Sequence, residues 1–377
     1  MGDYQICTRC VMDTSDPGVT FDAKGHCSAC NAYLEQRAVR GYRPGESERE
    51  LDALVERIKR DNRDREYDVI LGISGGVDSA YMAYLAHQRG LRVLAVHVDT
   101  GWNSEMAVRN IERMCKSLDI QLHTIVIDWP TMKELQRAYM LSGVANLDVP
   151  QDHALMTAVM RFAKRYKVGY VLNGNNLATE GASSPYTAQQ TYMDFWHIRS
   201  IYRRHGRGAS LRKYPRLSFL EARWKFPSIT KIDILNYVPY SKREAIETLS
   251  REFGWEYYGG KHFESRFTKY FQSVYLPRKF GYDKRRYHLS CLIMNGELTR
   301  DEALKELAAP PYPVRQQRED EDYILKKLEI DPAEWQKILN APPTPNDAYF
   351  SQEKLIALGK RLLGRKRVEA IRRRKSV

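Results

Sequence analysis

The sequence predicts an α/β protein built on a doubly wound parallel sheet, with a small N-terminal four-cysteine metal module and a mostly helical C-terminal region. Three observations lead to this fold class. Short apolar runs alternate with segments of helical periodicity between residues 67 and 172, which is the pattern of parallel strands joined by helices. Four of the six cysteines lie in the first 30 residues. After residue 240, polar residues are set in helical, aromatic sequence.

The individual elements follow from local patterns. Ser47 is predicted to cap a helix whose apolar residues recur at helical spacing, namely Leu51, Leu54, Val55 and Ile58. Apolar runs predict strands over 67–73, 91–98, 121–127 and 168–172, and the segments between them predict helices over 80–89, 105–118 and 152–166. Gly90 is expected to end the helix over 80–89. We therefore divide the chain into 1–33 (four-cysteine module), 34–66 (linker and helix), 67–240 (sheet domain) and 241–377 (helical region).

The N-terminal cysteines have the spacing of a metal site. They form one C-x2-C pair, then sixteen residues, then a second C-x2-C pair: Cys7, Cys10, Cys27 and Cys30. Two such turns present four thiolates to one tetrahedral ion, and a site with four protein ligands is structural rather than catalytic. Zinc is the expected ion, and an iron–sulfur cluster is the smaller rival. Two disulfides are less expected, because no secretory signal precedes the cysteines.

A glycine-rich loop after the first predicted strand indicates a phosphate site. The residues expected to bind ATP here are Gly72, Ser74, Gly75, Gly76, Val77, Asp78 and Ser79. Two glycines let backbone amides approach phosphate oxygens closely, and the N-terminus of the following helix adds partial positive charge. Asp78 in a site built for anions is best explained as a ligand of Mg2+. The Gly-Lys-Ser/Thr ending of a Walker loop is absent.

A second candidate region follows the fourth predicted strand. Asn173, Gly174 and Asn175 lie where the carboxyl end of that strand meets the edge of the sheet, and Glu180 follows them. Ligands of open α/β sheets bind at this edge. We expect the three residues to contribute to the nucleotide site, and Glu180 to bind the substrate or a second Mg2+. A plain turn is the alternative.

The loop resembles the signature of the PP-loop superfamily, whose members split ATP between the α- and β-phosphates. The shared motif is Ser-Gly-Gly-x-Asp-Ser, which is complete here from Ser74 to Ser79. The resemblance implies that the loop holds the pyrophosphate leaving group. It also implies that the end of the second strand, with His97 and Asp99, lies near the adenosine.

Longer stretches resemble the N-acetyl sugar amidotransferases. These stretches are 7–17, 259–265 and 279–286. Members of that family serve bacterial surface-polysaccharide and lipopolysaccharide biosynthesis, where they use ATP to convert an acetamido group of a nucleotide-linked sugar into an acetamidino group. The resemblance implies an O-adenylyl imidate intermediate, with Phe263 standing where the family has a second histidine.

The resemblance also assigns site residues. Those expected to act in catalysis are Asp78, Lys261, His262 and Arg285. Those expected to bind the substrate are Glu180, Lys261, His262, Glu264, Lys284 and Arg285. Lysine and arginine would neutralise a diphosphate, and His262 is the expected proton carrier. The implied cofactors are ATP, Mg2+ and Zn2+.

The source of ammonia is expected to be a partner. A glutaminase needs a nucleophilic cysteine, and outside the four-cysteine module the chain has only Cys115 and Cys291, neither of which follows elbow glycines. The resemblance implies a separate glutaminase subunit and an ammonia-channelling barrel subunit, similar to the pair of histidine biosynthesis.

The net charge of +13 favours polyanionic partners without choosing among them. A tRNA-modifying enzyme of the thiolation type is therefore the main alternative, although no RNA-binding motif and no reactive cysteine pair is evident. A nucleotide sensor is a third alternative. Residues 196–225 are rich in arginine and aromatic residues and suit a sugar-linked diphosphate, an acidic partner or a solvated surface. With neither a signal peptide nor an apolar membrane span, the cytoplasm is the expected compartment.

Overall fold

The computed structural model describes residues 4–181, 194–352 and 355. A five-stranded parallel sheet forms its centre, in the order β3-β2-β1-β4-β5. The strands are β1 (Val69–Gly72), β2 (Val93–Asp99), β3 (Gln121–Val126), β4 (Tyr170–Leu172) and β5 (Thr230–Ile232). The strand order reverses direction on either side of β1, so the carboxyl end of β1 lies at a topological switch point.

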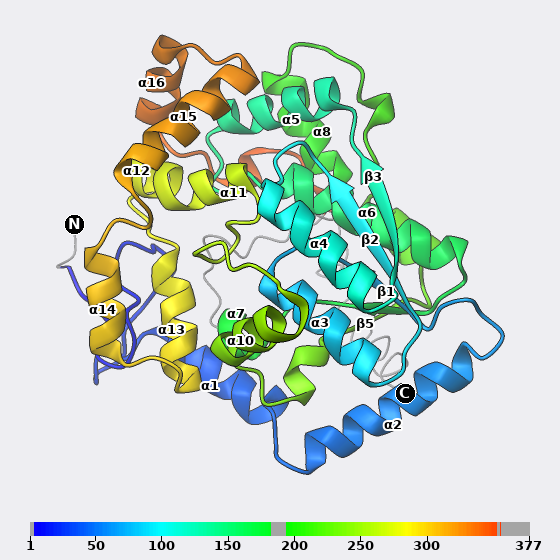
Figure 1. The fold of residues 1–377 in the computed structure, drawn as a ribbon. Coiled ribbons are helices and arrows are strands. Elements are labelled where there is room, and N and C mark those ends of the chain that lie inside the picture. The colour runs from blue at the N-terminus through cyan, green and yellow to red at the C-terminus, as the bar shows by residue number, and fades with distance from the viewer. Residues whose placement is uncertain (1–3, 182–193, 353–354, 356–377) are drawn as a thin grey trace.

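Helices cover both faces of the sheet (Figure 1). On one face, Val69 and Leu71 pack with α2 (Glu46–Asp61), α3 (Val77–Gln88), α4 (Glu105–Ser117) and α10 (Lys242–Phe253). On the other face, Ile70 packs with α5 (Trp129–Ser142), α6 (Val149–Arg165) and α8 (Phe195–His205). Alternate residues of β1 thus enter opposite cores, as a strand with period two requires. The predicted doubly wound α/β fold is confirmed.

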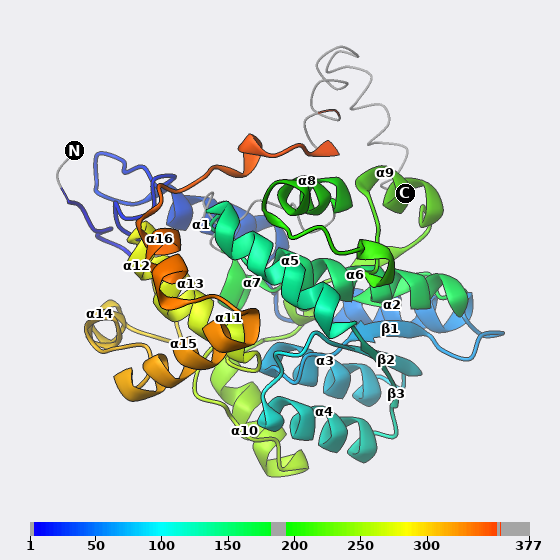
Figure 2. The ribbon, with the colours of Figure 1, turned by 90° about the horizontal axis from the view of Figure 1, so that it is seen from above.

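The C-terminal region is mostly helical, as predicted. Its helices are α11 (Arg266–Tyr270), α12 (Leu276–Phe280), α13 (Arg285–Asn295), α14 (Arg300–Ala308), α15 (Val314–Leu328) and α16 (Pro332–Asn340), with a π-helical turn at Phe271–Tyr275. Figure 2 shows α11, α12, α15 and α16 grouped beside α5. The remaining short elements are α7 (Leu177–Glu180), α9 (Phe219–Lys225) and the 3-10 turns Leu211–Lys213, Ile234–Tyr237 and Asn346–Ala348.

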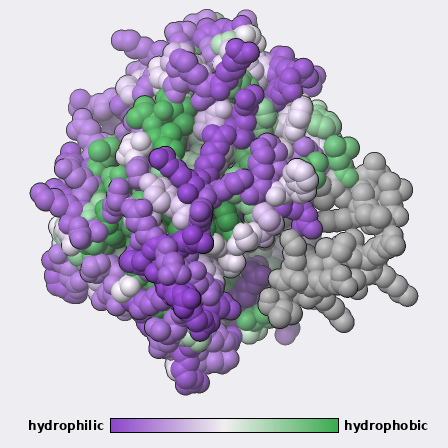
Figure 3. All heavy atoms as spheres, turned by 90° about the vertical axis from the view of Figure 1, so that its right-hand side faces the viewer, coloured by the Kyte–Doolittle hydropathy of each residue, from purple (hydrophilic) through white to green (hydrophobic). Residues whose placement is uncertain are grey.

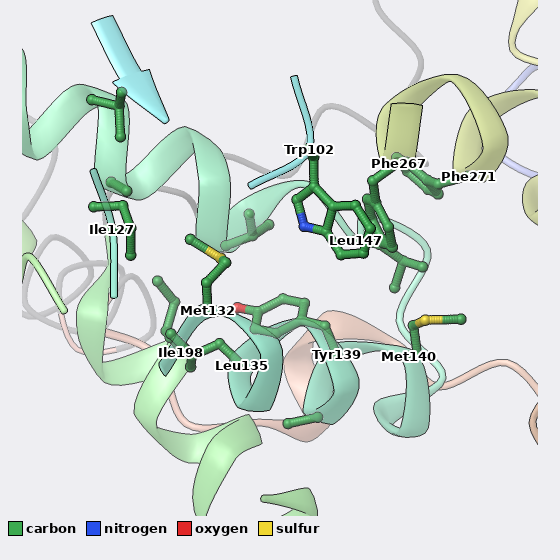
Figure 4. Packing of buried hydrophobic residues seen from close by; sticks show 14 of the residues in the cluster. Trp102, Ile127, Met132, Leu135, Tyr139, Met140, Leu147, Ile198, Phe267 and Phe271 are labelled. Atoms are coloured by element: carbon green, nitrogen blue, oxygen red, sulfur yellow. The ribbon is translucent and has the colours of Figure 1, made fainter. Parts of the chain in front are cut away.

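The largest core joins the sheet to this helical layer. Figure 4 shows Trp102, from the loop after β2, against Phe267 of α11, and the two ring centroids are 5.0 Å apart. Met132, Leu135 and Tyr139 of α5 fill the space below them in the same view. Because Trp102 is buried by residues far along the chain, the C-terminal helices are part of the core that fixes the loop after β2.

The N-terminal module packs on the C-terminal helices α13 and α14 (Figure 1). Its helix α1 (Ser28–Arg40) runs through residue 33, so the predicted boundary between 33 and 34 falls inside a helix. Arg300 donates to the carbonyl oxygens of Cys7 and Cys10 at 3.0–3.2 Å. Arg286 contacts Asp13 at 3.0 Å. The first and last parts of the chain therefore stabilise each other.

Most predicted elements are present with shifted ends, and one cap is wrong. The helix predicted to begin near residue 80 begins at Val77, and Gly90, with φ of +66°, follows it as predicted. The N-cap of α2 is Gly45 rather than Ser47. Ser47 instead lies in the first turn, where its hydroxyl accepts a hydrogen bond from the Arg43 amide at 3.0 Å. The backbone at the N-cap adopts a left-handed conformation, with φ of +73°, and glycine adopts this conformation more readily than serine.

Among the described residues, no helix is both long enough and apolar enough to cross a membrane. The face seen in Figure 3 is largely hydrophilic, and its hydrophobic atoms form separate patches rather than one continuous area.

Candidate active site

The glycine-rich loop connects β1 to α3 at the switch point of the sheet. Gly75 has φ of +82°, and a Cβ at this position would lie 2.5 Å from the carbonyl oxygen of Ala107. Only glycine therefore allows the loop to touch α4 so closely. Gly76 is the N-cap of α3 and offers no capping side chain, so the first amides of α3 face the loop. This is the arrangement that binds anions at a helix N-terminus.

The two serines of the loop hold it closed. The hydroxyl of Ser79 donates to the carbonyl oxygen of Gly76 at 3.0 Å, and it lies 3.3 Å from the hydroxyl of Ser74. The amide of Gly76 donates to the Ser74 hydroxyl at 3.2 Å. These contacts place two hydroxyls and several amides around one small space, which suits the oxygens of a phosphate chain.

A segment from the C-terminal half, 255–264, covers the loop. The indole of Trp255 donates to the carbonyl oxygen of Gly75 at 3.3 Å, and the hydroxyl of Tyr258 accepts from the Val77 amide at 3.1 Å. The carboxylate of Glu264 lies 3.5 Å from the Ser74 hydroxyl. One oxygen of that carboxylate is buried without a hydrogen-bond partner in the described part of the chain. Sequence resemblance placed Glu264 in the site, and the structure brings it directly to the loop.

Asp78 and Lys261 form the centre of the site. The Lys261 ammonium lies 3.4 Å from the Asp78 carboxylate and 2.9 Å from that of Glu180, and it donates to the Thr179 hydroxyl at 2.8 Å. The hydroxyl of Tyr240 also donates to Asp78. Three segments that are distant in sequence thus meet at the loop.

The charges in this centre set the protonation states. Burial raises the pKa of the Asp78 carboxyl, but the Lys261 ammonium and the Tyr240 hydrogen bond outweigh burial and lower that pKa. Burial disfavours the Lys261 ammonium, yet Asp78 and Glu180 raise its pKa above the usual value. Asp78 is therefore ionised and Lys261 is charged at neutral pH. An ionised carboxylate at the mouth of a phosphate loop fits a magnesium ion that accompanies ATP.

The end of β2 lines a small cavity next to the loop. His97 contacts the carbonyl oxygen of Ile73 through Nδ1 at 2.9 Å and the Asn103 amide through Nε2 at 3.0 Å. Asp99 accepts from the same Asn103 amide at 3.2 Å. The cavity has a volume of about 220 Å³ and is also lined by Ser74. His97 therefore lies in the wall of the small cavity beside the loop. Asp99 does not line that cavity and contacts its wall through Asn103.

The residues after β4 line a larger cavity of about 860 Å³. Asn173 and Asn175 lie in its wall, as does Glu180. Gly174 is turned toward the loop, since a Cβ on it would lie 4.0 Å from the Cβ of Asp78. The small and large cavities share wall residues, namely Asn146, Asp152, Leu155 and Lys284. The two cavities therefore meet at a common boundary beside α6.

This boundary carries acidic residues that sequence reasoning missed. Asp148 accepts hydrogen bonds from Thr268 at 2.9 Å and from Gln272 at 3.3 Å. Asp152 faces both cavities one helical turn later. Although solvent reaches Asp152, desolvation by the protein around it, together with the nearby Asp148 carboxylate, raises the pKa of Asp152 to about 7. The available signal was Asp152 at the start of the predicted helix and a second aspartate four residues before it. Because the helix in fact begins at Val149 with Asp148 as its N-cap, the two aspartates lie one helical turn apart.

The structure separates the predicted pair Lys284 and Arg285. Lys284 lines both cavities, and burial lowers the pKa of its ammonium although Asp148 and Glu180 oppose that change. Arg285 does not reach the site. Its guanidinium binds the Asp283 carboxylate at 2.8 Å and donates to three carbonyl oxygens, those of Glu306, Leu307 and Ala309. Arg285 therefore ties α13 to the end of α14, and its predicted roles in catalysis and substrate binding find no support in this geometry.

His262 lies at the edge of the small cavity. Its backbone has φ of +63°, an uncommon value for a residue with a side chain. The imidazole Nδ1 is 3.9 Å from the Glu264 carboxylate, and the ring centroid is 5.7 Å from that of His288. His262 is thus brought to the site together with Lys261, Glu264 and Lys284, and its role as a proton carrier stays a prediction.

The four N-terminal cysteines form a compact cluster away from these cavities. Their sulfur atoms all lie within 4.8 Å of one another, and the residues are fully buried. None forms a disulfide. Backbone amides point at the sulfurs, with the Cys27 amide 3.2 Å from the Cys7 sulfur and the Cys30 amide 3.3 Å from the Cys27 sulfur. Such hydrogen bonds stabilise thiolates, so the cluster fits a tetrahedral metal ion such as zinc.

Two family models match separate parts of the chain. Residues 264–363 match "LPS biosynthesis protein WbpG-like, C-terminal domain", and residues 68–178 match "Queuosine biosynthesis protein QueC". The first match covers the segment that includes Glu264 and Lys284. The second begins at β1 and ends in α7, so it contains the glycine-rich loop.

Curated relatives match short parts of the chain. A tRNA-specific 2-thiouridylase MnmA from Nitratiruptor sp. is 29% identical over 29% of this chain and 33% of its own length. A tRNA(Ile)-lysidine synthase from Chlamydia pneumoniae is 34% identical over 18% of this chain and 22% of its own length. The chain thus spans about a third or less of these relatives.

Among solved structures, an NH3-dependent NAD synthetase from Campylobacter jejuni subsp. jejuni is similar over 42% of this chain and 72% of its own. That similarity has 15% identity and a TM-score of 0.29. At so low a score, the fold rests on the sheet topology described above.

Proposed function

Because this chain belongs to the N-acetyl sugar amidotransferase family within the PP-loop superfamily, we propose that it converts an acetamido group of a nucleotide-linked sugar into an acetamidino group. The PP-loop match makes the chain an ATP-using enzyme, and the WbpG-like domain connects it with lipopolysaccharide biosynthesis. The amidotransferase reaction, its sugar substrate and its partners are the proposal.

The observation that carries the proposal is the meeting of two cavities at a charged boundary. The small cavity adjoins the glycine-rich loop, while the large one lies within the roughly 300–1,000 Å³ typical of ligand pockets. Lys284 and Asp152 stand between them. ATP bound at the loop and a sugar in the large cavity would therefore face each other across these two residues.

The first step is adenylation of the amide oxygen. That oxygen attacks the α-phosphorus of ATP, the P–O bond to pyrophosphate breaks, and pyrophosphate leaves with the electron pair. The loop amides and the Lys261 ammonium lie where negative charge grows on the leaving group. Magnesium held by Asp78 would add positive charge at the same place.

The second step needs a base. Ammonia adds to the imidate carbon, which creates a cationic nitrogen with one proton too many. A carboxylate takes that proton, the nitrogen lone pair forms the C=N bond, and AMP leaves with the electrons of the C–O bond. Asp152 lies at the boundary of the two cavities, and its pKa of about 7 suits proton exchange near neutral pH. We assign it this role.

A separate glutaminase would supply the ammonia. Cys115 is buried in the core, and burial raises its pKa to about 11, which is the opposite of an activated nucleophile. Cys291 is fully buried in the cluster that contains the four-cysteine module. These placements support the proposal of a glutaminase subunit and an ammonia-channelling subunit as partners.

The test is mass spectrometry of nucleotide-linked N-acetyl sugars after incubation with the full chain, ATP, magnesium and excess ammonium chloride at alkaline pH. Free ammonia replaces the partner. We expect a product in which one oxygen has become NH, together with AMP in equal amount. An Asp78→Asn variant should give neither. If no sugar in the panel changes mass while ATP is still bound, the proposal is wrong.

A tRNA-modifying function is the second candidate, because curated relatives that match part of the chain are named as tRNA enzymes. Thiolation generally requires a reactive cysteine pair close to the ATP site. In the described structure, the cysteines outside the four-cysteine module are single and buried. Addition of tRNA to the same assay separates the candidates, since AMP release that depends on tRNA would favour this second function.

A further inference from the structure

A third cavity continues from the large one, away from the loop. It has a volume of about 480 Å³ and lies between the end of α1, the start of α2 and β5. The two cavities share four wall residues, namely Arg40, Lys231, Asp233 and Asn236. A ligand in the large cavity can therefore extend into the third without leaving the protein surface.

Cations that form no direct ion pair mark the passage between the two cavities, and the Asp233 carboxylate of the same wall interacts with Arg40 and Lys231 only through space. Arg40 and Lys231 stand in the shared wall, and Arg57 lies farther out in the third cavity. None of the three side chains makes a hydrogen bond or ion pair with a residue that the structure describes. By contrast, Arg43 in the same cavity is paired with Glu46 at 2.7 Å. The passage thus presents positive charge that the protein does not neutralise through direct contacts.

The charge on Lys231 is poorly stabilised by the residues around it. Burial lowers the pKa of its ammonium, and the nearby Asp233 carboxylate only partly opposes that change. Asp233 already accepts a hydrogen bond from the Asn173 amide at 2.6 Å, and burial raises its own pKa. An ammonium with so little compensation favours the arrival of an anion from outside.

The position fits one part of the proposed substrate. The acetamido carbon must lie at the inner end of the large cavity, beside Lys284 and Asp152, for its oxygen to reach the α-phosphorus. The opposite end of the sugar then points outward, toward Arg40 and Lys231. In a nucleotide-linked sugar, that end carries the diphosphate.

We propose that Arg40 and Lys231 bind the diphosphate of the sugar substrate, and that the third cavity holds its nucleoside. The assignment rests on the proposed function, since it takes the large cavity as the sugar site. It predicts a nucleoside diphosphate as the recognised group, so a sugar linked to a nucleoside monophosphate would lack one of the two charges that the cations meet.

The experiment compares an Arg40→Gln, Lys231→Gln double variant with the wild-type chain. Neither side chain forms a hydrogen bond or ion pair with a described residue, and both line surface cavities, so the fold should persist. Calorimetric titration with uridine and cytidine diphosphates should show binding weakened about tenfold or more in the double variant. Titration with ATP should be unchanged. An Arg40→Lys, Lys231→Arg variant keeps both charges and should retain most of the diphosphate affinity.

A matched control removes two cations elsewhere. Lys116→Gln with Lys305→Gln lowers the net charge equally at exposed positions outside the three cavities, and it should leave diphosphate binding as in the wild type. Kinetically, the Arg40, Lys231 double variant should raise the KM for the converted nucleotide sugar while kcat stays within a few-fold, because the lost contacts are far from the reacting bonds.

Diphosphate affinity equal to the wild type in the double variant overturns the inference, even if sugars are still amidinated. Loss of tRNA binding in the double variant, with no diphosphate binding in the wild type, also overturns it and identifies the passage as an RNA surface. Failure of the proposed function alone looks different: the wild type then binds ATP and converts no sugar.

Discussion

The ammonium of Lys261 lies 3.4 Å from the carboxylate of Asp78, although 183 positions separate the two residues in the chain. Lys261 belongs to the segment that covers the glycine-rich loop, and its side chain is only 10% exposed. The contact therefore links the ATP site of the sheet domain to the segment that leads into the WbpG-like region. This ion pair also holds the segment 255–264 against the glycine-rich loop.

Removal of this ammonium should disable the first half-reaction. In a Lys261→Gln variant, Asp78 and Glu180 lose their shared cation, and the growing charge on pyrophosphate loses a donor. We expect ATP–pyrophosphate exchange in the presence of the sugar to fall about 10²- to 10³-fold. Lys261→Arg keeps the charge and should retain more activity. Exchange at the wild-type rate in the glutamine variant would show that Lys261 has no part in adenylation.

Gly75 should tolerate no side chain because of its close contact with α4, and Gly296 serves as a control that lacks such a contact. A Cβ at Gly75 would meet the Ala107 carbonyl oxygen at 2.5 Å, whereas Gly296 has the same φ of +82° and nothing within 4 Å. Gly296→Ala should cost only the left-handed conformation, about 1–2 kcal/mol of unfolding free energy. Gly75→Ala should cost more in urea unfolding and should also abolish ATP binding. Equal losses of stability would contradict the close contact with α4.

The pH dependence of the second half-reaction should follow Asp152. Its folded-state pKa is raised to about 7 because desolvation and Asp148 disfavour the carboxylate, while Lys284 opposes them and Glu180 adds to them. The base is therefore available above pH 7 and is lost as the pH falls through 7. Single-turnover amidination, measured with the concentration of free ammonia held constant, should decline below that pH.

Asp152→Asn provides the control for this profile. The variant should be slower and should lack the decline below pH 7, while ATP–pyrophosphate exchange remains close to that of the wild type. An unchanged rate profile in the variant would remove Asp152 from the mechanism.

The same raised pKa predicts an effect on stability. Because the unfolded carboxyl ionises near pH 4 and the folded one near pH 7, the wild-type fold loses stability as the pH rises between these values. The melting temperature of Asp152→Asn relative to the wild type should therefore be higher at pH 8 than at pH 4. A difference that is the same at both pH values would show that the pKa of Asp152 is not raised in the folded chain.

Two adjacent residues should behave differently on substitution. Lys284 faces both cavities, whereas Arg285 binds Asp283 and the carbonyl oxygens at the end of α14. Arg285→Gln should lower the unfolding free energy by about 1–3 kcal/mol and leave KM values unchanged. Lys284→Gln should reduce turnover at least tenfold with little change in melting temperature. Reduced turnover in Arg285→Gln together with reduced stability in Lys284→Gln would show that Arg285, rather than Lys284, acts in the active site.

The four-cysteine cluster should hold one structural metal ion whose removal weakens the C-terminal helices. Arg300 binds the carbonyl oxygens of Cys7 and Cys10, so collapse of the cluster would free α14 as well. Elemental analysis should find one zinc per chain, and Cys27→Ser should lose it and melt several degrees lower. If the analysis instead finds iron and sulfide in the wild-type protein, the site holds an iron–sulfur cluster rather than zinc. Full metal content in Cys27→Ser would exclude the cysteine as a ligand.

The sequence predicted four of the five strands and the glycine-rich loop because these depend on local patterns, whereas β5 was not predicted. Apolar runs that are buried on both faces mark parallel strands, and Gly75 and Gly76 after such a run mark a turn at its carboxyl end. The paired cysteines were equally visible, since their spacing alone defines the cluster. Lys261 and Glu264 were found through a resemblance and because polar residues cluster there in otherwise helical, aromatic sequence.

Other features depend on tertiary contacts that no local pattern contains. No sequence pattern distinguished Arg285 from Lys284. Only the position of α14 shows that Arg285 binds carbonyl oxygens at the end of that helix. Asp148 and Asp152 were not singled out in the sequence, because only the folded chain brings Thr268 and Gln272 to Asp148 and places Asp152 between the two cavities. Gly45 rather than Ser47 caps α2 because the chain enters that helix in a left-handed conformation, a constraint set by the preceding turn.

The measurement that tests the central claim most directly is the fate of the acetamide oxygen. A nucleotide-linked N-acetyl sugar labelled with heavy oxygen in the acetamido carbonyl is incubated with the full chain, ATP, magnesium and ammonia, and the AMP is analysed by mass spectrometry. Adenylation of the amide oxygen predicts that the label appears in AMP in proportion to the amidine formed. Unlabelled AMP alongside amidine product would contradict the account, because the oxygen would then have left by a route that does not involve the α-phosphate.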